Sequence, residues 1–493
     1  MYSKVYCTAP LNKTRQDPAG QALYLKVAGE LAAMIAGGQL LPQERVPSVR
    51  ALSRQRRISA TTAIASLRSL ERRGLIEARP QSGYFVARRK PQLAEPAQAR
   101  ASRTVRQVGV KALLSRLFDA NLDPTVARLG QAIPDASLFP QRPLRRELLN
   151  ATRADPQLLT DYEFRVAGSA SLRHEIARHY AHLGARLDEE ELLVTNGCME
   201  ALNLAVRAVA RPGDTIAVES PTYFGFLQIV EAQGVKVVEI PAHPRDGLSV
   251  EALRELLASR AGKSVRACMV IGNFSNPTGA TLPERRKREL LQLCREADIA
   301  LIEDDIYGDL QHSGPRPLPC KAFDTDGRVL LCSSFSKSLA PGARIGFIAG
   351  GRYSEEIRAA KFVASIATAP LQQEMIARYL RAGRYERHLL RVRRAFAEQL
   401  ERVSQIVDAT FPAGTRVTRP QGGFVLWVEL DGDIDTMQLY ERARRVGVDF
   451  VPGALFSAAG NYRNCMRLNC GLLVTAAVEA AVTRLGNLVK TRS

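Results

Sequence analysis

The chain has 493 residues, 46% of them hydrophobic, and a net charge of +19. This length and composition allow more than one domain with a large core. No run of about twenty apolar residues occurs, which excludes a membrane-spanning helix, and residues 1–16 lack the apolar core of a signal peptide. The eight cysteines show no C-x-x-C pair and no zinc spacing, so we expect no metal site and a reducing, cytoplasmic location.

The positive charge is concentrated near the start of the chain. Residues 1–90 hold 16 Lys or Arg and five Asp or Glu. Such a basic block favours a polyanionic partner, with nucleic acid ranked before a membrane surface. A solvated, arginine-rich surface is the alternative, and composition alone does not separate the two.

Residues 21–74 predict three helices. Apolar residues recur at helical spacing from Gln21 to Ile35, and Gly37 and Gly38 would end that helix. A second helix begins at Ser48, whose hydroxyl can accept from free backbone N–H groups, and runs to about residue 56. A third begins at Ser59 and ends at Gly74, with a predicted inner stripe of Ala63, Ile64, Leu67 and Leu70.

Two short strands, LIEAR and YFVAR around the turn PQSG, complete a winged helix-turn-helix of the α+β class. The third helix begins with Ser59, Thr61 and Thr62, whose short hydroxyl side chains let a backbone approach phosphates and base edges. A small helical cap with arginines as surface charge is the alternative. The arginines that would add salt-dependent attraction to phosphates are Arg50, Arg54, Arg56, Arg57, Arg68, Arg72 and Arg79.

This block resembles the DNA-binding domain of GntR-type bacterial regulators. The pieces that carry the resemblance are RVPSVRALS, ISATTAIASLRSLERRGLI and QSGYFV. The resemblance implies double-stranded DNA as partner, contacted by Arg50, Ser59, Thr61 and Gly83, with Thr62 beside them. Ala60 stands where many members have an arginine, which weakens the expectation of base readout there.

The expected domain boundaries are 1–90 for the winged helix-turn-helix, 91–112 for a linker and 113–493 for a second domain. Residues 91–109 are rich in Pro, Ala, Gln, Ser and Arg and show little apolar periodicity. Such a composition is typical of a flexible, mildly basic tether.

The second domain has the pattern of a large α/β protein. Short apolar runs end in polar clusters and alternate with helical patterns, as in LLVTNG, TIAVESP, ACMVIGNFSNPTG, IALIEDD and VLLCSS. Strands spaced by helices predict a mostly parallel sheet, with a ligand site at the carboxyl ends of its strands.

Together these clusters describe a pocket for pyridoxal 5′-phosphate (PLP). The turn and helix start in TNGCMEALNLAVRAVA form an anion site. A lysine can form a Schiff base with the aldehyde, and a carboxylate can keep the pyridine nitrogen protonated. Each residue alone has an ordinary alternative, such as a solvated lysine or a capping aspartate. The remaining contributors are Asp304, Tyr307, Asn276, Tyr223, Ser334, Ser336, Lys337 and Arg344.

Residues 125–490 resemble fold-type I PLP enzymes, specifically class I/II aminotransferases. The resemblance implies that Lys337 forms the Schiff base with PLP and that Asp304 pairs with the pyridine nitrogen. Tyr307 and Asn276 would bond the phenolic oxygen of the ring, and Tyr223 would stack on it. The implied phosphate site consists of Gly197, Cys198, Met199, Ser334 and Arg344, and Ser336 is a further predicted cofactor-binding residue. Tyr162 would reach the phosphate of a neighbouring subunit in a homodimer, and Arg467 would hold a ligand's carboxylate. Gln131 and Ala132 depart from the glycine that many relatives carry near the substrate.

A GntR-like winged helix followed by an aminotransferase-like domain is the architecture of MocR-type regulators. The resemblance implies a transcriptional regulator whose second domain dimerises and senses an amine, an amino acid or PLP itself. An aminotransferase with a vestigial first domain is the alternative, since every residue needed for transamination is present. A cofactor-free dimeric scaffold would leave Lys337 and the phosphate site without a role.

Overall fold

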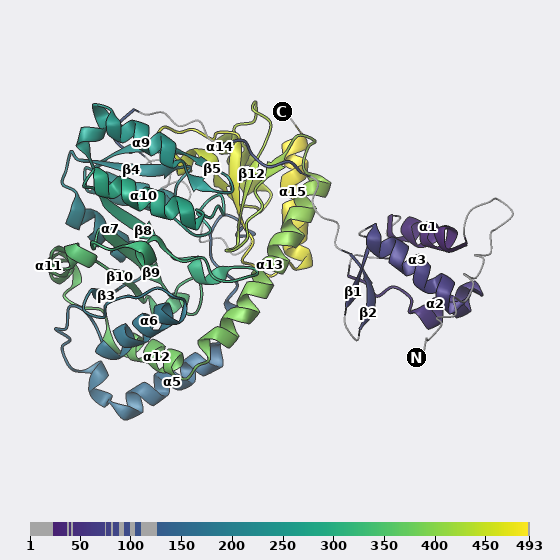
Figure 1. Ribbon diagram of the computed structural model, residues 1–493, viewed down its shortest axis with the longest axis horizontal. Coiled ribbons are helices and arrows are strands. Elements are labelled where there is room, and N and C mark those ends of the chain that lie inside the picture. Colours follow the sequence, from purple (N-terminus) through teal and green to yellow (C-terminus); the bar gives the residue numbers. More distant parts are fainter. Residues whose placement is uncertain are drawn as a thin grey trace, which may run out of the picture. The chain divides into compact units, whose positions relative to one another are not determined.

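The computed structural model describes residues 23–36, 39–40, 43–73, 75–79, 82–87, 93–98, 104–109 and 126–491. The chain divides into two compact units, Met1–Pro91 and Gln92–Ser493 (Figure 1). None of the helices within the described ranges combines the length and apolar character needed to span a bilayer.

The first unit has the predicted winged helix-turn-helix order. Its elements are α1 (Leu23–Ala36), α2 (Val49–Arg56), α3 (Ala60–Arg72), β1 (Ile76–Arg79) and β2 (Gly83–Val86), with the two strands antiparallel. As predicted, α2 begins at Ser48, whose side chain accepts a hydrogen bond from the backbone N–H of Ala51 at 3.2 Å. The glycines expected to end α1 and α3, Gly37, Gly38 and Gly74, lie outside the described residues.

The predicted inner stripe of α3 is wrong at one position. Ala63, Leu67 and Leu70 are fully buried in the core of this unit, but Ile64 is 38% exposed. Successive residues of a helix are turned by about 100°, so Ile64 follows Ala63 onto the outer face. Ser66, on the other side of the stripe from Ile64, is buried instead.

An eight-stranded sheet forms the centre of the second unit, which confirms the predicted α/β fold. The strand order is β3-β10-β9-β8-β7-β4-β5-β6. Strands β5, β4, β7, β8 and β9 are parallel to their neighbours in this series, and β10 is antiparallel to both of its own. The strands are β3 (Leu192–Thr195), β4 (Thr215–Ser220), β5 (Lys236–His243), β6 (Gly247–Leu248), β7 (Val265–Val270), β8 (Ala300–Asp304), β9 (Val329–Ser334) and β10 (Gly346–Ala349).

Helices cover both faces of this sheet, because successive side chains of a strand point to opposite sides. In β8, Ile302 joins the core beneath α7 and α8, whereas Leu301 joins the core beneath α9 and α10. Both faces of β8 therefore carry apolar side chains, and its last residue, Asp304, is polar. The α-helices among the described residues of the second unit are α5 (Gln141–Ala154), α6 (Ala170–His182), α7 (Cys198–Val209), α8 (Phe224–Ala232), α9 (Val250–Ala258), α10 (Glu284–Glu296), α11 (Ser354–Ser365), α12 (Pro370–Arg381), α13 (Tyr385–Thr410), α14 (Thr436–Arg445) and α15 (Ala476–Lys490).

A smaller antiparallel sheet lies in the same unit. Its order is β11-β12-β14-β13, and a separate hydrophobic core joins it to α13, α14 and α15. Its strands are β11 (Arg416–Val417), β12 (Val425–Glu429), β13 (Val451–Pro452) and β14 (Cys465–Asn469).

Parts of the expected flexible linker are instead fixed on the second unit. Ala94 forms a bridge with Arg416 of β11. Arg106 exchanges two backbone hydrogen bonds of 2.9 Å with Val237 of β5, and Val108 is buried in a core of the large sheet. The alanine- and arginine-rich composition of the segment did not predict these contacts, because pairing between backbone groups requires no pattern of apolar side chains.

Candidate functional site

The start of α3 is held by its own hydroxyl groups. Ser59 caps the helix by accepting from the backbone N–H of Thr62 at 3.1 Å, and its Oγ lies 2.8 Å from Thr62 Oγ1. Two of the predicted DNA-contacting side chains therefore bond to each other. Thr61, one residue into the same turn, is exposed.

The predicted arginines of the first unit differ in their surroundings. Arg50 is exposed near the start of α2, whereas Arg56 pairs with Glu30 at 2.8 Å. Arg79 pairs with Glu77 at 2.7 Å and lies 4.3 Å from the centre of the Phe85 ring. Arg56 and Arg79 thus have partners within the described part of this unit as well as solvent contact.

The wing contributes a glycine with an unusual backbone angle. Gly83 has φ +101°, a region that side-chain-bearing residues rarely adopt, and the guanidinium of Arg45 lies 3.5 Å from the position of a Cβ there. This glycine therefore allows the tight turn between β1 and β2.

A cavity of about 430 Å³ lies at the carboxyl ends of the central strands of the second unit. Its wall also includes the start of α7 and residues of the smaller sheet and its neighbours. The cavity brings together eleven of the predicted site residues: Cys198, Met199, Tyr223, Asn276, Asp304, Tyr307, Ser334, Ser336, Lys337, Arg344 and Arg467.

One wall of the cavity has the features of an anion site. Gly197 caps α7 with φ +86° and provides no side-chain cap, which leaves the backbone N–H groups of the first turn available. A Cβ on Gly197 would lie 2.6 Å from Nη2 of Arg344. The guanidinium donates to Ser336 Oγ and to the Asn196 carbonyl, each at 3.3 Å. Only a glycine fits this approach.

Asp304 lies at the end of β8 and is buried. Its Oδ1 accepts from the Ile306 N–H at 3.1 Å and from the Cys198 thiol at 3.5 Å. Burial raises the pKa of Asp304 to about 6, although these two hydrogen bonds act in the opposite direction. Such a carboxylate gains from a cationic N–H partner in the cavity.

Lys337 projects into the same space from the turn after β9. Its Nζ donates to the Ala132 carbonyl at 2.6 Å. Burial, together with the charges of Arg467 and Arg344, lowers the pKa of this amine to about 8. A sizeable uncharged fraction near neutral pH makes the lysine a nucleophile.

Arg467 reaches the cavity from β14 and is 2% exposed. Its Nη1 donates to Asn276 Oδ1 at 3.0 Å, and its Nη2 donates to the Gly130 carbonyl. Its Nε has no hydrogen-bond partner among the described residues. Phe224 and Phe456 lie under the guanidinium, with ring centres 5.8 and 5.3 Å away. A planar cation with an unused donor is suited to a carboxylate.

Two residues predicted for this site are absent from the cavity lining: Gly197, which lies next to the lining residue Cys198, and Tyr162, which lies apart from it. Tyr162 is 69% exposed, and its ring lies 4.6 Å from that of the exposed Phe164. Within one chain these two aromatic side chains face solvent.

The sequence did not identify several cavity residues. Asp449, whose Oδ1 accepts from the Gly130 N–H at 2.7 Å, fixes the segment that carries the Gly130 and Ala132 carbonyls. No local sequence pattern marked Asp449, because its partner Gly130 is 319 residues away in the chain. The other unidentified lining residues are Gly130, Ile133, Leu202, Phe224, Gln228, Ile306, Tyr440, Phe450 and Val451.

Comparison with known families matches both units. Residues 147–485 match the aminotransferase class I and II family, and residues 23–86 match the gntR family of bacterial regulatory proteins. The Escherichia coli HTH-type transcriptional regulator YjiR is 37% identical over 466 residues, covering 94% of this chain and 98% of YjiR. The regulator YdcR of the same organism is 34% identical, covering 95% and 99%.

Solved structures match the second unit. A Pyrococcus horikoshii kynurenine aminotransferase in complex with PMP has a TM-score of 0.72 and 29% identity, covering 78% of this chain and 95% of its own. The α-aminoadipate aminotransferase LysN of Thermus thermophilus, complexed with N-(5′-phosphopyridoxyl)-L-leucine, has a TM-score of 0.70 and 28% identity, covering the same shares. The chain therefore belongs to the aminotransferase class I and II family and, with its GntR-type winged helix, to the MocR-type subfamily of GntR regulators.

Proposed function

We propose that the protein is a DNA-binding transcriptional regulator that binds PLP in its aminotransferase-like unit. The observation that carries this proposal is that a winged helix with an exposed basic surface and an intact cofactor-shaped cavity occur in one chain. DNA would then be the partner of the first unit, and a cytoplasmic location is part of the proposal. The second unit would respond to an amine, an amino acid or PLP.

The cavity residues fit PLP by their chemistry. The Gly197 and Arg344 cradle accommodates a phosphate, since a Cβ would close it. Asp304 suits a protonated ring nitrogen, and the depressed pKa of Lys337 suits covalent attachment. When bound, PLP supplies an aldehyde that reacts with amines and a ring that accepts electrons.

The protein's own groups would divide the remaining work. Arg467 would orient a ligand carboxylate through its unused Nε–H and through its Nη2, where the carboxylate would replace the Gly130 carbonyl. Lys337 would hold or move a proton beside the ligand. A ligand that rearranges these contacts changes the relative free energies of two states of the unit, which is the requirement for a sensor.

A mobility-shift assay tests the regulator directly. The full-length protein is titrated against the DNA upstream of its own gene at several salt concentrations, with and without PLP and with candidate amines. We expect salt-dependent binding whose affinity changes with the ligand. Absent binding, or binding that salt does not weaken, would reject DNA recognition.

An aminotransferase is the second candidate, because Lys337, Asp304 and Arg467 meet in one cavity as transamination requires. Incubation with a panel of amino acids and an oxo-acid acceptor tests it. Turnover of about 1 per second or faster would support an enzyme. DNA binding without turnover would support the regulator.

We also propose a homodimer in which Tyr162 approaches the cavity of the second subunit. The support is that Tyr162 and Phe164 form an exposed aromatic pair outside their own cavity. Sedimentation should show a dimer, and Tyr162→Ala should weaken PLP binding without altering the Lys337 attachment site. A monomer that binds PLP normally would refute this arrangement.

A further inference from the structure

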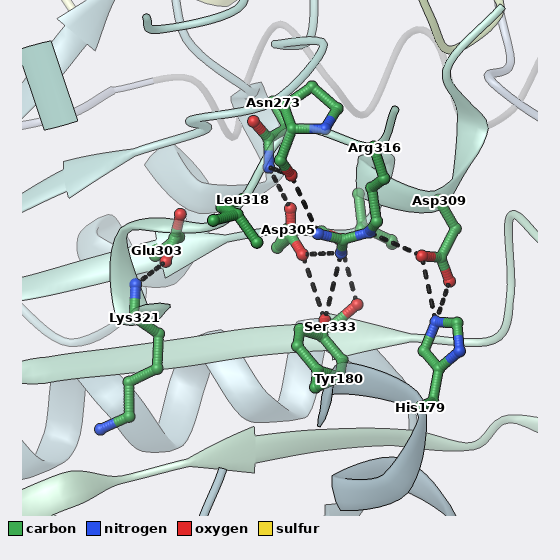
Figure 2. Close-up of polar contacts among 12 residues, drawn as sticks. His179, Tyr180, Asn273, Glu303, Asp305, Asp309, Arg316, Leu318, Lys321 and Ser333 are labelled. Carbon is green, nitrogen blue, oxygen red and sulfur yellow. Dashed lines mark hydrogen bonds and ion pairs between the residues drawn. The ribbon is translucent and has the colours of Figure 1, made fainter. Parts of the chain in front are cut away.

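A cluster of buried charges lies behind the cavity, outside its lining. Figure 2 shows Arg316 between Asp305 and Asp309, with His179 and Tyr180 close by. We call these five residues the Arg316 cluster. The side chains of Arg316 and Asp305 are 2% and 0% exposed, so their charges are removed from water.

On one side the cluster fixes the turn after β8. Arg316 Nη2 pairs with Asp305 Oδ2, and Asn273 Nδ2 donates to Asp305 Oδ1 at 2.8 Å. The Tyr180 hydroxyl donates to Asp305 Oδ2 at 3.1 Å, and Ser333 Oγ donates to the Asp305 carbonyl at 3.1 Å. The two carboxylate oxygens and the carbonyl oxygen of Asp305 are thus bonded to residues outside the cavity lining, while the neighbouring Asp304 lines the cavity.

On the other side the cluster reaches the turn that carries Lys337. Arg316 Nε donates to Asp309 Oδ1 at 2.7 Å. The Tyr385 hydroxyl lies 2.9 Å from Asp309 Oδ2 and 2.7 Å from Oγ of Ser338, the residue after Lys337. Hydrogen bonds therefore run from the residue beside Asp304 to the residue beside Lys337, with Arg316 at the centre.

The charge of Arg316 also balances two carboxylates. Burial raises the pKa of Asp304, and the charge of the adjacent Asp305 acts in the same direction, whereas the charge of Lys337 lowers it. Burial alone would raise the pKa of Asp309, but His179 and Arg316 lower it well below its usual range. Apolar residues of the same volume would fill this space at least as stably, so filling the core does not explain the cluster.

We propose that Arg316 is a positioning residue for the cofactor: through Asp305 and through Asp309, Tyr385 and Ser338 it fixes Asp304 relative to Lys337. The inference rests on the proposed binding of PLP. It assigns Arg316 no contact with the cofactor.

Arg328 provides a matched control. It is a buried arginine of the same unit, paired with Asp326 at 2.6 Å and donating to the carbonyls of Cys294 and Ile299. Its own carbonyl accepts from the Leu301 N–H at the amino end of β8. The two arginines thus brace opposite ends of one strand, and Arg316 is the one at the cavity end.

The experiment compares Arg316→Gln, Arg316→Lys and Arg328→Gln in the full-length protein. PLP affinity is measured by absorbance titration, the orientation of bound PLP by visible circular dichroism, and stability by thermal unfolding without PLP. At a similar loss of Tm, Arg316→Gln should weaken PLP binding about tenfold more than Arg328→Gln and change the visible dichroism. Lysine restores the positive charge, but its single ammonium group lacks the planar donors with which the guanidinium binds Asp305 and Asp309 at once. Arg316→Lys should therefore recover part of the PLP affinity.

Equal losses of PLP affinity in Arg316→Gln and Arg328→Gln would overturn the proposal. If Arg316→Gln does not fold, Tyr385→Phe removes one hydroxyl from the path to Ser338 and keeps the ring. Tyr385→Phe should alter the dichroism of bound PLP at nearly unchanged Tm, and an unaltered signal would also overturn the proposal. A wild-type protein that binds no PLP would instead refute the proposed function.

Discussion

The two units of the protein place their candidate binding groups in opposite environments. In the first unit the groups are exposed, and arginines such as Arg50 lie in water. In the second unit Asp304 and Arg467 are buried, and Lys337 has a strongly shifted pKa. Exposed charges act at long range and are screened by salt, whereas buried groups act through contact geometry. Salt and pH should therefore separate the two activities.

The largest expected effect is the loss of Lys337. Lys337→Ala should abolish covalent attachment of PLP, because the cavity then has no amine beside Asp304. Borohydride reduction followed by mass spectrometry of the peptide measures attachment. Lys236→Ala, on β5, is the control that should keep it, and an adduct retained in Lys337→Ala would contradict the assignment.

The pH dependence of the wild type sharpens this prediction. Burial lowers the pKa of Lys337 to about 8, so the amine becomes uncharged as pH rises through that value. The rate of PLP attachment should rise up to about pH 8 and then level off, while DNA binding depends on arginines that do not titrate there.

The next effect concerns the phosphate cradle. Gly197→Ala would place a Cβ 2.6 Å from the Arg344 guanidinium at φ +86°, and the backbone strain costs about 1–3 kcal/mol. PLP affinity should fall strongly, as measured by absorbance titration. Gly213 has φ +93° and nothing within 4 Å of its Cβ position, so Gly213→Ala should show the strain without the loss of affinity. Equal PLP affinities of Gly197→Ala and Gly213→Ala would show that the contact with Arg344 does not contribute to the effect.

A smaller effect is expected at the exposed surface. Arg50→Ala should weaken DNA binding and reduce the salt slope by about 1, the value for one phosphate contact. The readout is the mobility shift at several salt concentrations, with PLP binding unchanged. Arg56 already pairs with Glu30, so Arg56→Ala should reduce the slope less, and the reverse order would contradict this interpretation of the surface.

The smallest effect separates capping from DNA contact. Ser59→Ala removes the cap of α3 and should cost about 1 kcal/mol of unfolding free energy in the first unit, measured by denaturant titration. Thr61 is exposed beside it, so Thr61→Ala should leave stability unchanged within about 0.5 kcal/mol and still weaken DNA binding.

The sequence predicted the elements and the cavity where a local pattern encodes them. Polar clusters after apolar strands located Asp304 and Lys337, and a capping serine located α2. It did not predict that Ile64 is exposed. An apolar residue directly after a buried alanine can lie on the inner or the outer face of a helix, and the sequence pattern does not distinguish the two. Arg316 and Asp449 were also missed, because their contacts join residues that only the tertiary fold brings together.

The pairing of Arg106 with Val237 has a consequence for the sheet. Strand β6 covers Ala242 and His243 of β5, which would leave the first half of β5 as a free edge, and free edges invite pairing with other chains. Arg106 satisfies the backbone N–H and carbonyl of Val237 in that half. The segment that joins the units therefore also covers part of the exposed edge of the sheet. A shortened protein starting at residue 110 should aggregate under conditions in which the full-length chain does not.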